Sequence, residues 1–514
     1  MWKTVISSIL IVATCFGGAP LFVENELLIR FDDGLSQEDI EIILLDQPLE
    51  IVRQVSRPLN LWLVQVDLSR RQLHKALGQI EDFPEIRHAQ NDHYLSERLE
   101  PNDPFYDQQW NFENTGQTSG TVGADIDAAE AWEITTGGET ILGRVIVAGV
   151  VDGGCDMIHP DLVNNFWTNP GDTLGNGIDD DENGWVDDSL GWNAFGHNGE
   201  IPTSSHGTHV AGIIGAHSNN DNQVAGVNWD IKLMIVAGSS TTTATAMEAY
   251  SYILEQKLAW LETGGAEGAF VVSVNSSFGI DGADCESGEY PLWNDMFNAM
   301  GEAGILSIGA TSNTNTNIDL AGDVPTGCSS PYLITVTNTN KYDVKSIAGY
   351  GAESIDLGAP GSIILSTNFY QGTTFKSGTS MAAPHVTGAV ALMHSAANVE
   401  LAQYYEQYPA MGAQLFKAMV MASVDTLAAL EGLTVTGGRL NLHKAVLRAS
   451  SWFIPGDGNM NEDETVNIQD VIILINLIMG NIEVTPELLV IGDLNSDLFV
   501  NVQDLIVLIN HILQ

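Results

Sequence analysis

The stretch VIVAGVVD, residues 145–152, is a short apolar run that ends on an aspartate. Similar runs recur as FVVSVNSSFG at 270–279, GILSIGATS at 304–312 and YLITVTNT at 332–339, with helix-like segments between them. Short apolar strands that alternate with helices are typical of a mostly parallel sheet that is covered on both faces. The pattern predicts an α/β fold for residues 103–450, and such folds gather chemical groups at the carboxyl ends of their strands.

Three more segments surround this region. Residues 24–97 combine strand-like stretches such as ELLIRF and LWLVQVDL with helix-like ones such as SQEDIEIIL and SRRQLHKALGQI, which indicates a small α/β unit. Residues 456–514 contain two copies of one template, which indicates an internal repeat that forms a small helical domain. Residues 1–19 have the features of a signal peptide.

The signal peptide is predicted from its three parts. Lys3 precedes an apolar run from Val5 to Phe16, and small residues follow, with cleavage expected after Ala19. The run is shorter than the ~20 residues that a membrane-spanning helix needs, and no other stretch is long enough. We therefore predict a secreted, extracellular protein without a transmembrane segment. A lipoprotein signal at Cys15 is the alternative.

The acidic balance of the chain excludes several functions. The 514 residues include 66 Asp and Glu against 19 Lys and Arg, which gives a formal net charge of −47. Nucleic-acid binding relies on Lys and Arg to displace the counterions of the phosphates, and anionic lipid would also repel such a surface. We expect no nucleic-acid partner. The charge favours solubility and the binding of hard cations.

Three cysteines remain once the signal is removed, which is an odd number. Cys285 and Cys328 lie in polar, glycine-rich loop sequence, whereas Cys155 lies just after the strand that ends at Asp152. Exported proteins commonly contain disulfides. We expect a Cys285–Cys328 disulfide and a free, buried Cys155 that packs as a small apolar side chain.

Three motifs supply the residue types of nucleophilic catalysis. Asp152 ends a strand in VVDGG, His206 lies in HGTHVAG, and Ser380 lies in GTSMAAPHVTG before an alanine-rich helix. A serine hydroxyl is a weak nucleophile that needs an adjacent imidazole to accept its proton. The imidazole needs a buried carboxylate that holds its tautomer and stabilises the imidazolium. The motifs therefore predict a triad of Asp152, His206 and Ser380.

These motifs, in the chain order Asp, His, Ser, resemble the subtilisin-like serine proteases, the peptidase S8 family. HPDL after the Asp motif and GGRLN at 437–441 add to the likeness. The resemblance implies a three-layer fold and hydrolysis of polypeptide substrates by a serine endopeptidase. By the motif GILSIGATSN it implies Asn313 as the oxyanion donor, although Ser312 stands where the family usually has Gly. It also implies that Ser277, Phe278 and Gly279 form the edge that pairs with the substrate backbone.

The same resemblance gives the segment 24–97 a role. It is similar to the inhibitor-type propeptide of the family, most of all in VENELLIRFDDG and IRHAQNDHYLSE. Such a segment assists folding and blocks the cleft until it is cut off. The resemblance therefore implies a zymogen whose own propeptide is its inhibitor.

The sequence GNGIDDDENGWVDD, residues 175–188, collects acidic side chains in a glycine-bounded turn. Asp179, Asp181 and Asn183 alternate as in a DxDxNG cation loop, and Asp187 follows. Hard oxygen ligands at this spacing suit Ca²⁺, and without a cation the carboxylates repel one another. We expect a calcium site here. A solvated acidic loop is the alternative.

The repeat in 456–514 places oxygen-bearing side chains at positions 1, 3, 5, 9 and 12 of two EF-hand-like loops, each followed by a helix. The first loop carries Asn459, Asn461, Asp463, Asn467 and Asp470. The second carries Asp493, Asn495, Asp497, Asn501 and Asp504. The repeat resembles a dockerin module, which binds Ca²⁺ in both loops and docks on a cohesin-type domain. A metal-free helical hairpin is the alternative.

Two functions compete for the whole chain. The first is an active, exported serine endopeptidase that its C-terminal module carries or anchors, if need be at the cell surface. The second is a catalytically silent surface-assembly protein that acts through the dockerin-like module. Labelling with a serine-reactive probe separates them.

Overall fold

The computed structural model describes residues 22–32, 34–44, 49–66, 83, 85–93, 99–452, 458–461, 465–482, 488, 491–492, 494 and 500–512. The chain divides into two compact units, Met1–Glu97 and Arg98–Gln514. The predicted signal peptide and the predicted helix in SRRQLHKALGQI lie outside the described residues.

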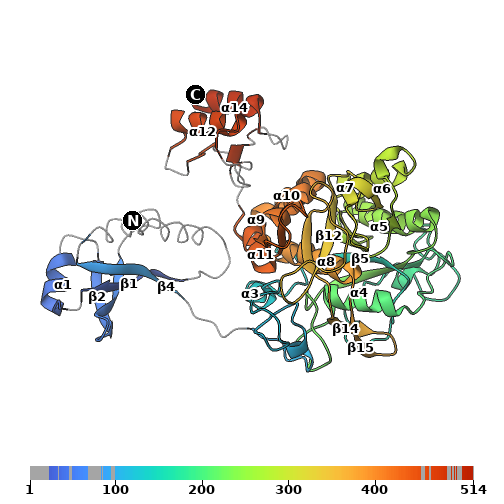
Figure 1. The fold of residues 1–514 in the computed structure, drawn as a ribbon, viewed down its shortest axis with the longest axis horizontal. Coiled ribbons are helices and arrows are strands. Elements are labelled where there is room, and N and C mark those ends of the chain that lie inside the picture. The colour runs from blue at the N-terminus through green and yellow to red at the C-terminus, as the bar shows by residue number, and fades with distance from the viewer. Residues whose placement is uncertain are drawn as a thin grey trace. The chain divides into compact units, whose positions relative to one another are not determined.

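The N-terminal unit, blue in Figure 1, is a four-stranded antiparallel sheet with the order β2-β3-β1-β4 and one helix. Its elements are β1 (Phe22–Phe31), α1 (Gln37–Leu44), β2 (Leu49–Ser56), β3 (Leu61–Val66) and β4 (Ile86–His93). Leu27, Ile29 and Phe31 alternate along β1 and pack with Ile40 of α1 in one apolar core. The alternation follows from the two-residue period of a strand, which sends every second side chain to the same face.

The second unit is built around a nine-stranded sheet with the order β16-β17-β13-β12-β10-β8-β5-β7-β6. Its strands are β5 (Val147–Asp152), β6 (Trp192–Asn193), β7 (Lys232–Ala237), β8 (Val271–Ser276), β10 (Leu306–Ala310), β12 (Leu333–Thr339), β13 (Leu357–Pro360), β16 (Val424–Thr426) and β17 (Gly438–Leu440). Every neighbouring pair is parallel except β16 with β17. Two short antiparallel pairs lie outside this sheet: β9 (Ile280–Asp281) with β11 (Asp323–Val324), and β14 (Ile364–Asn368) with β15 (Gly372–Lys376).

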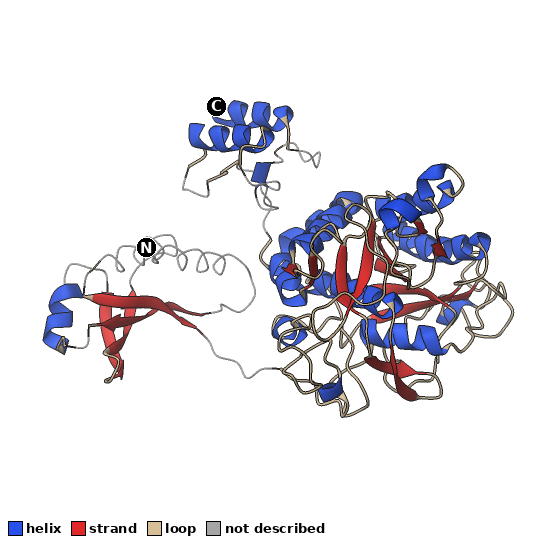
Figure 2. Cartoon of the chain, viewed as in Figure 1, coloured by secondary structure: helices blue, strands red, loops and turns tan. Residues whose placement is uncertain are grey.

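Helices cover both faces of this sheet (Figure 2). They are α3 (Ala128–Trp132), α4 (Ser205–Gly215), α5 (Thr243–Thr263), α6 (Pro291–Glu302), α7 (Ile318–Ala321), α8 (Thr379–Ala396), α9 (Val399–Gln407), α10 (Pro409–Ala422) and α11 (Leu442–Ser450). Ala148 and Val150 of β5 pack in a core with α4 and α8, whereas Val147 and Val151 pack in a second core with α5 and α6. Burial on both faces explains why the strands read as continuous apolar runs. The expected α/β fold with a mostly parallel sheet is confirmed.

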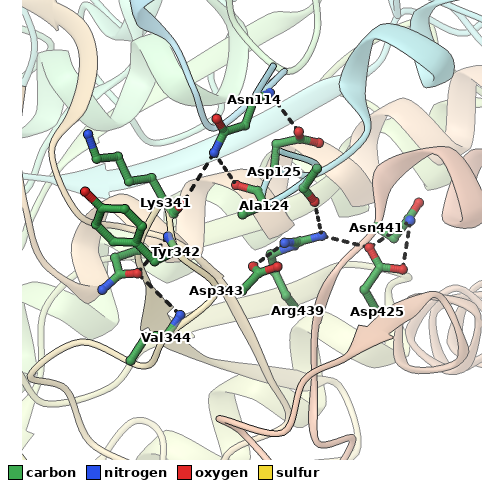
Figure 3. Close-up of polar contacts among 12 residues, drawn as sticks. Asn114, Ala124, Asp125, Lys341, Tyr342, Asp343, Val344, Asp425, Arg439 and Asn441 are labelled. Carbon is green, nitrogen blue, oxygen red and sulfur yellow. Dashed lines mark hydrogen bonds and ion pairs between the residues drawn. The ribbon is translucent and has the colours of Figure 1, made fainter. Parts of the chain in front are cut away.

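Arg439 links distant parts of this unit through a buried polar cluster (Figure 3). Its side chain is 2% exposed, and its Nη1 pairs with Asp343. Its Nη2 lies 2.8 Å from Asp425 Oδ2 and donates to the Gly123 carbonyl at 3.2 Å. We call Arg439, Asp343, Asp425 and Gly123 the Arg439 cluster. It supplies acceptors to both terminal nitrogens of a buried guanidinium, whereas Nε is buried without a partner.

The C-terminal repeat contains α12 (Ile468–Ile478) and α14 (Val502–Ile512). Val471, Leu474 and Leu477 of α12 share a small apolar core with Leu508 of α14. The side chain of Asn467 caps the start of α12. In the part of the chain that the structure describes, no helix combines the length and the apolarity that a membrane crossing requires.

Candidate active site

Asp152 and His206 form a hydrogen-bonded pair at the carboxyl edge of the sheet. Asp152 is the last residue of β5 and is 3% exposed, and His206 lies in the first turn of α4. His206 Nδ1 is 2.8 Å from Asp152 Oδ2, and the Gly153 N–H donates to Asp152 Oδ1 at 2.7 Å. Because the carboxylate can only accept, Nδ1 carries the proton and Nε2 is left as the basic nitrogen.

Gly207 allows this close approach of helix and strand. A Cβ atom at this position would lie 2.0 Å from the Gly154 carbonyl oxygen and 3.0 Å from Asp152 Oδ1. Any larger residue would force α4 away from β5. Gly207, directly after His206, is therefore a packing requirement of the Asp152–His206 pair.

Ser380 lies at the start of α8, beside the end of β8. Its Oγ donates to the Ser277 carbonyl at 3.3 Å, and the Ser277 hydroxyl donates to the Ser380 carbonyl at 3.1 Å. Gly378, the cap of α8, has a φ of +151° and would bring a Cβ to 3.0 Å from Asn313 Oδ1. The helix start, the strand edge and the Asn313 loop therefore meet at one point.

The orientation of the Asn313 amide follows from its contacts. The Thr379 N–H donates to Asn313 Oδ1 at 2.9 Å, and the Thr379 hydroxyl reaches the same oxygen at 3.2 Å. A backbone N–H can only donate, so the amide oxygen must face Thr379. The Nδ2 group then points away from α8 and is free to donate to another group.

Asp323 holds the loop that carries Asn313, a role that was not predicted from the sequence. The Ser312 N–H donates to Asp323 Oδ2 at 3.2 Å, and the hydroxyls of Thr311 and Thr326 donate to the same oxygen. Asp323 is 1% exposed, and burial raises its pKa to about 6. No motif or spacing marks this contact, because tertiary structure alone brings the two loops together.

The predicted substrate edge is partly a packing surface. Ser277 is buried against Ser380, whereas the ring of Phe278 lies 6.4 Å from the rings of Tyr250 and Trp293, measured between centroids. Gly279 approaches the neighbouring β11 so closely that a Cβ would lie 2.3 Å from the Val324 carbonyl oxygen. The half-buried Phe278 side chain therefore packs against the core, so any contact of this edge with a substrate would have to use the backbone.

The acidic loop 175–188 satisfies its carboxylates internally. Asp179 accepts from the backbone of Asn183 and of the next glycine, Asp181 accepts from the side chains of Asn169 and Asn183, and Asp187 accepts from the backbone of 176 and 177. Asp188, which is buried, accepts from Asn169, Tyr252 and Gln256. Among the residues that the structure describes, no three or more His, Cys, Asp or Glu side chains converge as metal ligands.

The two C-terminal loops share one arrangement. Asp470 and Asp504 are both buried at position 12. Asp470 accepts from the N–H groups of Asn461 and Asn467 at 3.1 and 2.8 Å, and Asp504 accepts from those of residues 494 and 501 at 2.8 Å each. Asn459 also belongs to the described part of the first loop. The predicted ligands Asp463, Asp493, Asn495 and Asp497 lie outside the described residues.

A second pair of buried carboxylates was not predicted. Asp103 and Asp161 are 4% and 0% exposed, and one oxygen of each accepts from the loop 219–224: Asp103 from the Asn219 N–H at 2.7 Å, and Asp161 from the Val224 N–H at 3.1 Å. The other oxygen of each is buried without a partner. Burial raises the pKa of both, that of Asp161 to about 6, and the charge of Asp103 raises the pKa of Asp161 further. Two acidic oxygens without partners, beside a loop rich in carbonyl and amide oxygens, fit a hard cation.

The cysteines are arranged as a bonded pair and a free thiol. The structure joins Cys285 to Cys328, whose Cα atoms are 5.0 Å apart. Cys155 is free and buried, and burial raises the pKa of its thiol to about 12. Its thiol is therefore protonated at neutral pH and packs in the core of α4 and α8.

Comparison with known proteins identifies the family. Residues 143–433 match the family model described as Subtilase family, and residues 457–513 match that of the Dockerin type I domain. The first match covers more than half of the chain, so the chain belongs to the subtilase family, and it carries a dockerin type I domain at its C-terminal end. Both resemblances drawn from the sequence motifs are confirmed.

Several individual proteins are similar to this chain. An "Extracellular protease" of Xanthomonas campestris is 30% identical over 66% of this chain and 57% of that protein. An "Extracellular basic protease" of Dichelobacter nodosus is 28% identical over 68% of this chain and 57% of that protein. A solved protease structure from Pseudoalteromonas arctica aligns at 22% identity with a TM-score of 0.48, over 68% of this chain and 99% of that one. The chain spans about half the length of the curated relatives it matches.

Proposed function

We propose that this protein is an exported serine endopeptidase that hydrolyses polypeptides through Asp152, His206 and Ser380. The observation that carries the proposal is the 2.8 Å contact between Asp152 and His206. Ser380 lies in the first turn of α8, which shares a core with the helix of His206, α4. In this orientation Asp152 holds the proton on Nδ1, which leaves Nε2 to act as the general base.

The reaction uses these groups in sequence. Nε2 of His206 accepts the proton of Ser380 Oγ, and Oγ attacks the peptide carbonyl carbon. The oxyanion accepts hydrogen bonds from Asn313 Nδ2 and from the backbone N–H of Ser380 in the first turn of α8. His206 then gives the proton to the leaving amine, and an acyl-enzyme forms on Ser380. Water, deprotonated by His206, releases the acid. In the resting protein the Ser380 hydroxyl bonds to the Ser277 carbonyl, so it must rotate toward His206 first.

The other segments receive roles in the same proposal. Residues 1–19 act as the signal peptide, 24–97 as the inhibitory propeptide, 103–450 as the catalytic domain and 456–514 as the dockerin module. Support for the propeptide comes from the separate sheet of the N-terminal unit, which has its own apolar core. Cleavage between 98 and 105 would free the enzyme.

The dockerin module would anchor the enzyme by binding a cohesin-type domain. Apolar side chains are exposed at equivalent places of its two helices, one repeat apart. On α12 these are Ile468, Ile472 and Ile475, and on α14 they are Val502, Ile506 and Ile509. An apolar face of this kind is stable in water when a partner covers it.

Calcium is the cation that these sites would take. Asp103 and Asp161 would hold it in the catalytic domain through their two oxygens without partners, and Asp470 and Asp504 would close the two dockerin loops around it. The ion would neutralise buried charge and link distant segments, and it takes no part in the chemistry. The ligands predicted in 175–188 stay a prediction, because their carboxylates already accept internal hydrogen bonds.

The alternative is a silent assembly protein, and one experiment separates the two. The full chain and its Ser380→Ala variant are treated with a fluorophosphonate probe and with casein. We expect labelling, casein hydrolysis and self-cleavage near 98–105 in the original chain and none of these in the variant. Ser395→Ala, on the same helix but bonded to Thr135, is the matched control and should behave as the original. Failure of the original chain to label or cleave would favour the assembly role.

A further inference from the structure

Lys376 carries a positive charge at the side of the candidate triad. It is the last residue of β15, four positions before Ser380. Its Nζ donates to Ser205 Oγ at 2.9 Å, and the same hydroxyl donates to Asn368 Oδ1 at 2.7 Å. Ser205 directly precedes His206 on α4. The ammonium therefore lies next to the start of α4, on the side of His206, while Asn313 contacts Thr379 at the start of α8.

Lys376 is one of several lysines in the described part of the chain that donate to neutral oxygens and form no ion pair, as Lys232 and Lys345 also do. Arg144, Lys417 and Lys444 form ion pairs with Glu406, Asp356 and Asp425, and the Arg439 cluster contains two carboxylates. Within the part of the chain that the structure describes, Lys376 contacts no carboxylate. An ammonium has three donors, and only one of them is used here. What sets Lys376 apart is its place: its contact with Ser205 holds the ammonium beside His206, where its other donors can bind an anion.

The charge of Lys376 acts on its surroundings. His209 lies one helical turn after Ser205 on α4, and its Nε2 donates to the carbonyls of Ile364 and Thr374. Burial lowers the pKa of His209 to about 3, and the positive charge of Lys376 lowers it further. His209 therefore stays neutral, and no second cation competes for an anion at Lys376.

The chemistry of peptide hydrolysis says which part of a substrate meets Lys376. His206 must give its proton to the leaving amine, so the residues after the scissile bond leave along the His206 side. The residues before that bond pair with the backbone of 277–279, next to the Ser277–Ser380 contacts. On this basis, and resting on the proposed function, we propose that Lys376 is a specificity-determining residue that binds a Glu or Asp side chain just after the scissile bond.

The expected effect is a substrate preference of modest size. A half-buried ion pair typically changes binding by about 5- to 30-fold. Because the charge is partly exposed, the preference should fall as salt is added. A lysine that only held α4 in place through Ser205 would instead affect all substrates equally.

The test uses one peptide that the original full-length protein cleaves at a single bond, chosen from a casein digest. Four versions carry Glu, Gln, Ala or Lys after that bond, and kcat/KM is measured for each. We expect the original protein to prefer Glu over Gln by about tenfold. Lys376→Met should remove this ratio and leave the Gln peptide within about twofold, and Lys376→Glu should favour the Lys peptide. Lys232→Met is the matched control. Lys232 begins β7 at the amino ends of the parallel strands, whereas Asp152 lies at the carboxyl end of the neighbouring β5.

Each other result overturns the inference in a different way. An equal loss for the Glu and Gln peptides in Lys376→Met would make Lys376 a positioning residue for α4. No preference in the original protein would remove the subsite. No cleavage of any peptide, together with no labelling by the serine probe, would overturn the proposed function as well. A cleavage-site profile of the original protein on a proteome-derived peptide library gives a second readout that needs no variant, and it should be enriched in Asp and Glu after the cut.

Discussion

The loop 175–188 and the pair Asp103–Asp161 both bring carboxylates together, but they differ in what satisfies them. In the loop, backbone N–H groups and amide side chains donate to the acidic oxygens, and Asp188 accepts from Tyr252 and Gln256. In the pair, each carboxylate keeps one buried oxygen without a donor. In this protein the run of acidic residues in the sequence forms a hydrogen-bonded turn, whereas the cation is proposed where two buried carboxylate oxygens lack donors.

Removal of calcium should have the largest effect. In the Ser380→Ala full chain, which cannot digest itself, chelation should unfold the C-terminal module, because so short a unit has little core of its own. It should also lower the melting temperature of the catalytic region by roughly 5 °C, since a ligand at about 100 times its Kd adds about 2.7 kcal/mol. Calorimetry with Ca²⁺ and with EGTA measures both, and superimposable scans would refute every calcium assignment.

Single substitutions should then decide between the two regions. Asp161→Asn in the Ser380→Ala chain should lose most of the calcium-dependent rise in melting temperature of the catalytic region, because the neutral amide is a weaker ligand. The matched variant Asp181→Asn, in the acidic loop, should keep it. The reverse pattern in the same melts would place the cation in 175–188 instead of at Asp103 and Asp161.

Asp188→Ala should destabilise the loop without touching calcium. The substitution leaves the buried donors of Tyr252 and Gln256 without an acceptor, which typically costs about 2–3 kcal/mol in free energy of unfolding. Urea unfolding of the Ser380→Ala chain, with and without Ca²⁺, is the measurement. An unchanged midpoint would show that these bonds contribute little, and a loss of the calcium response would give Asp188 a role as a ligand.

The pH dependence should show the smallest effect. Burial raises the pKa of Asp161 to about 6, above its ordinary value of 3.8. A carboxyl whose pKa is raised by folding stabilises the protein while it is protonated, and this contribution is lost as the pH rises through about 6. Without calcium, the free energy of unfolding should therefore fall between pH 4 and 6, on the order of 1–2 kcal/mol. With calcium the trend should weaken, because the ion binds the ionised carboxylates. In Asp161→Asn without calcium, the free energy of unfolding should change little between pH 4 and 6. If it still falls over this range, other groups cause the effect.

The sequence predicted the parts of the molecule that short motifs define. Asp152, His206 and Ser380 could be proposed as a triad because each lies in a compact motif whose residue types match one chemistry, and the structure pairs the first two. The parallel strands could be found because burial on both faces leaves continuous apolar runs such as VIVAGVVD. Tertiary contacts escaped: Lys376 and Ser205 are 171 residues apart, and Asp323 reaches the Ser312 N–H only after two loops fold together. Periodicity says nothing about such pairs.

The Arg439 cluster has a consequence for the order in which the chain can fold. The Gly123 carbonyl that Arg439 contacts lies 316 residues earlier in the chain. Asp343 and Asp425 also precede Arg439, so during synthesis from the N-terminus both carboxylates are made before their guanidinium. Until residue 439 is made, these two partly exposed carboxylates lack their guanidinium, so the segments around them are less stably packed. A contact of such long range closes late and slowly. A chain that stops before β17 therefore lacks the cation that lets the catalytic region close, and truncated products should remain open to proteolysis.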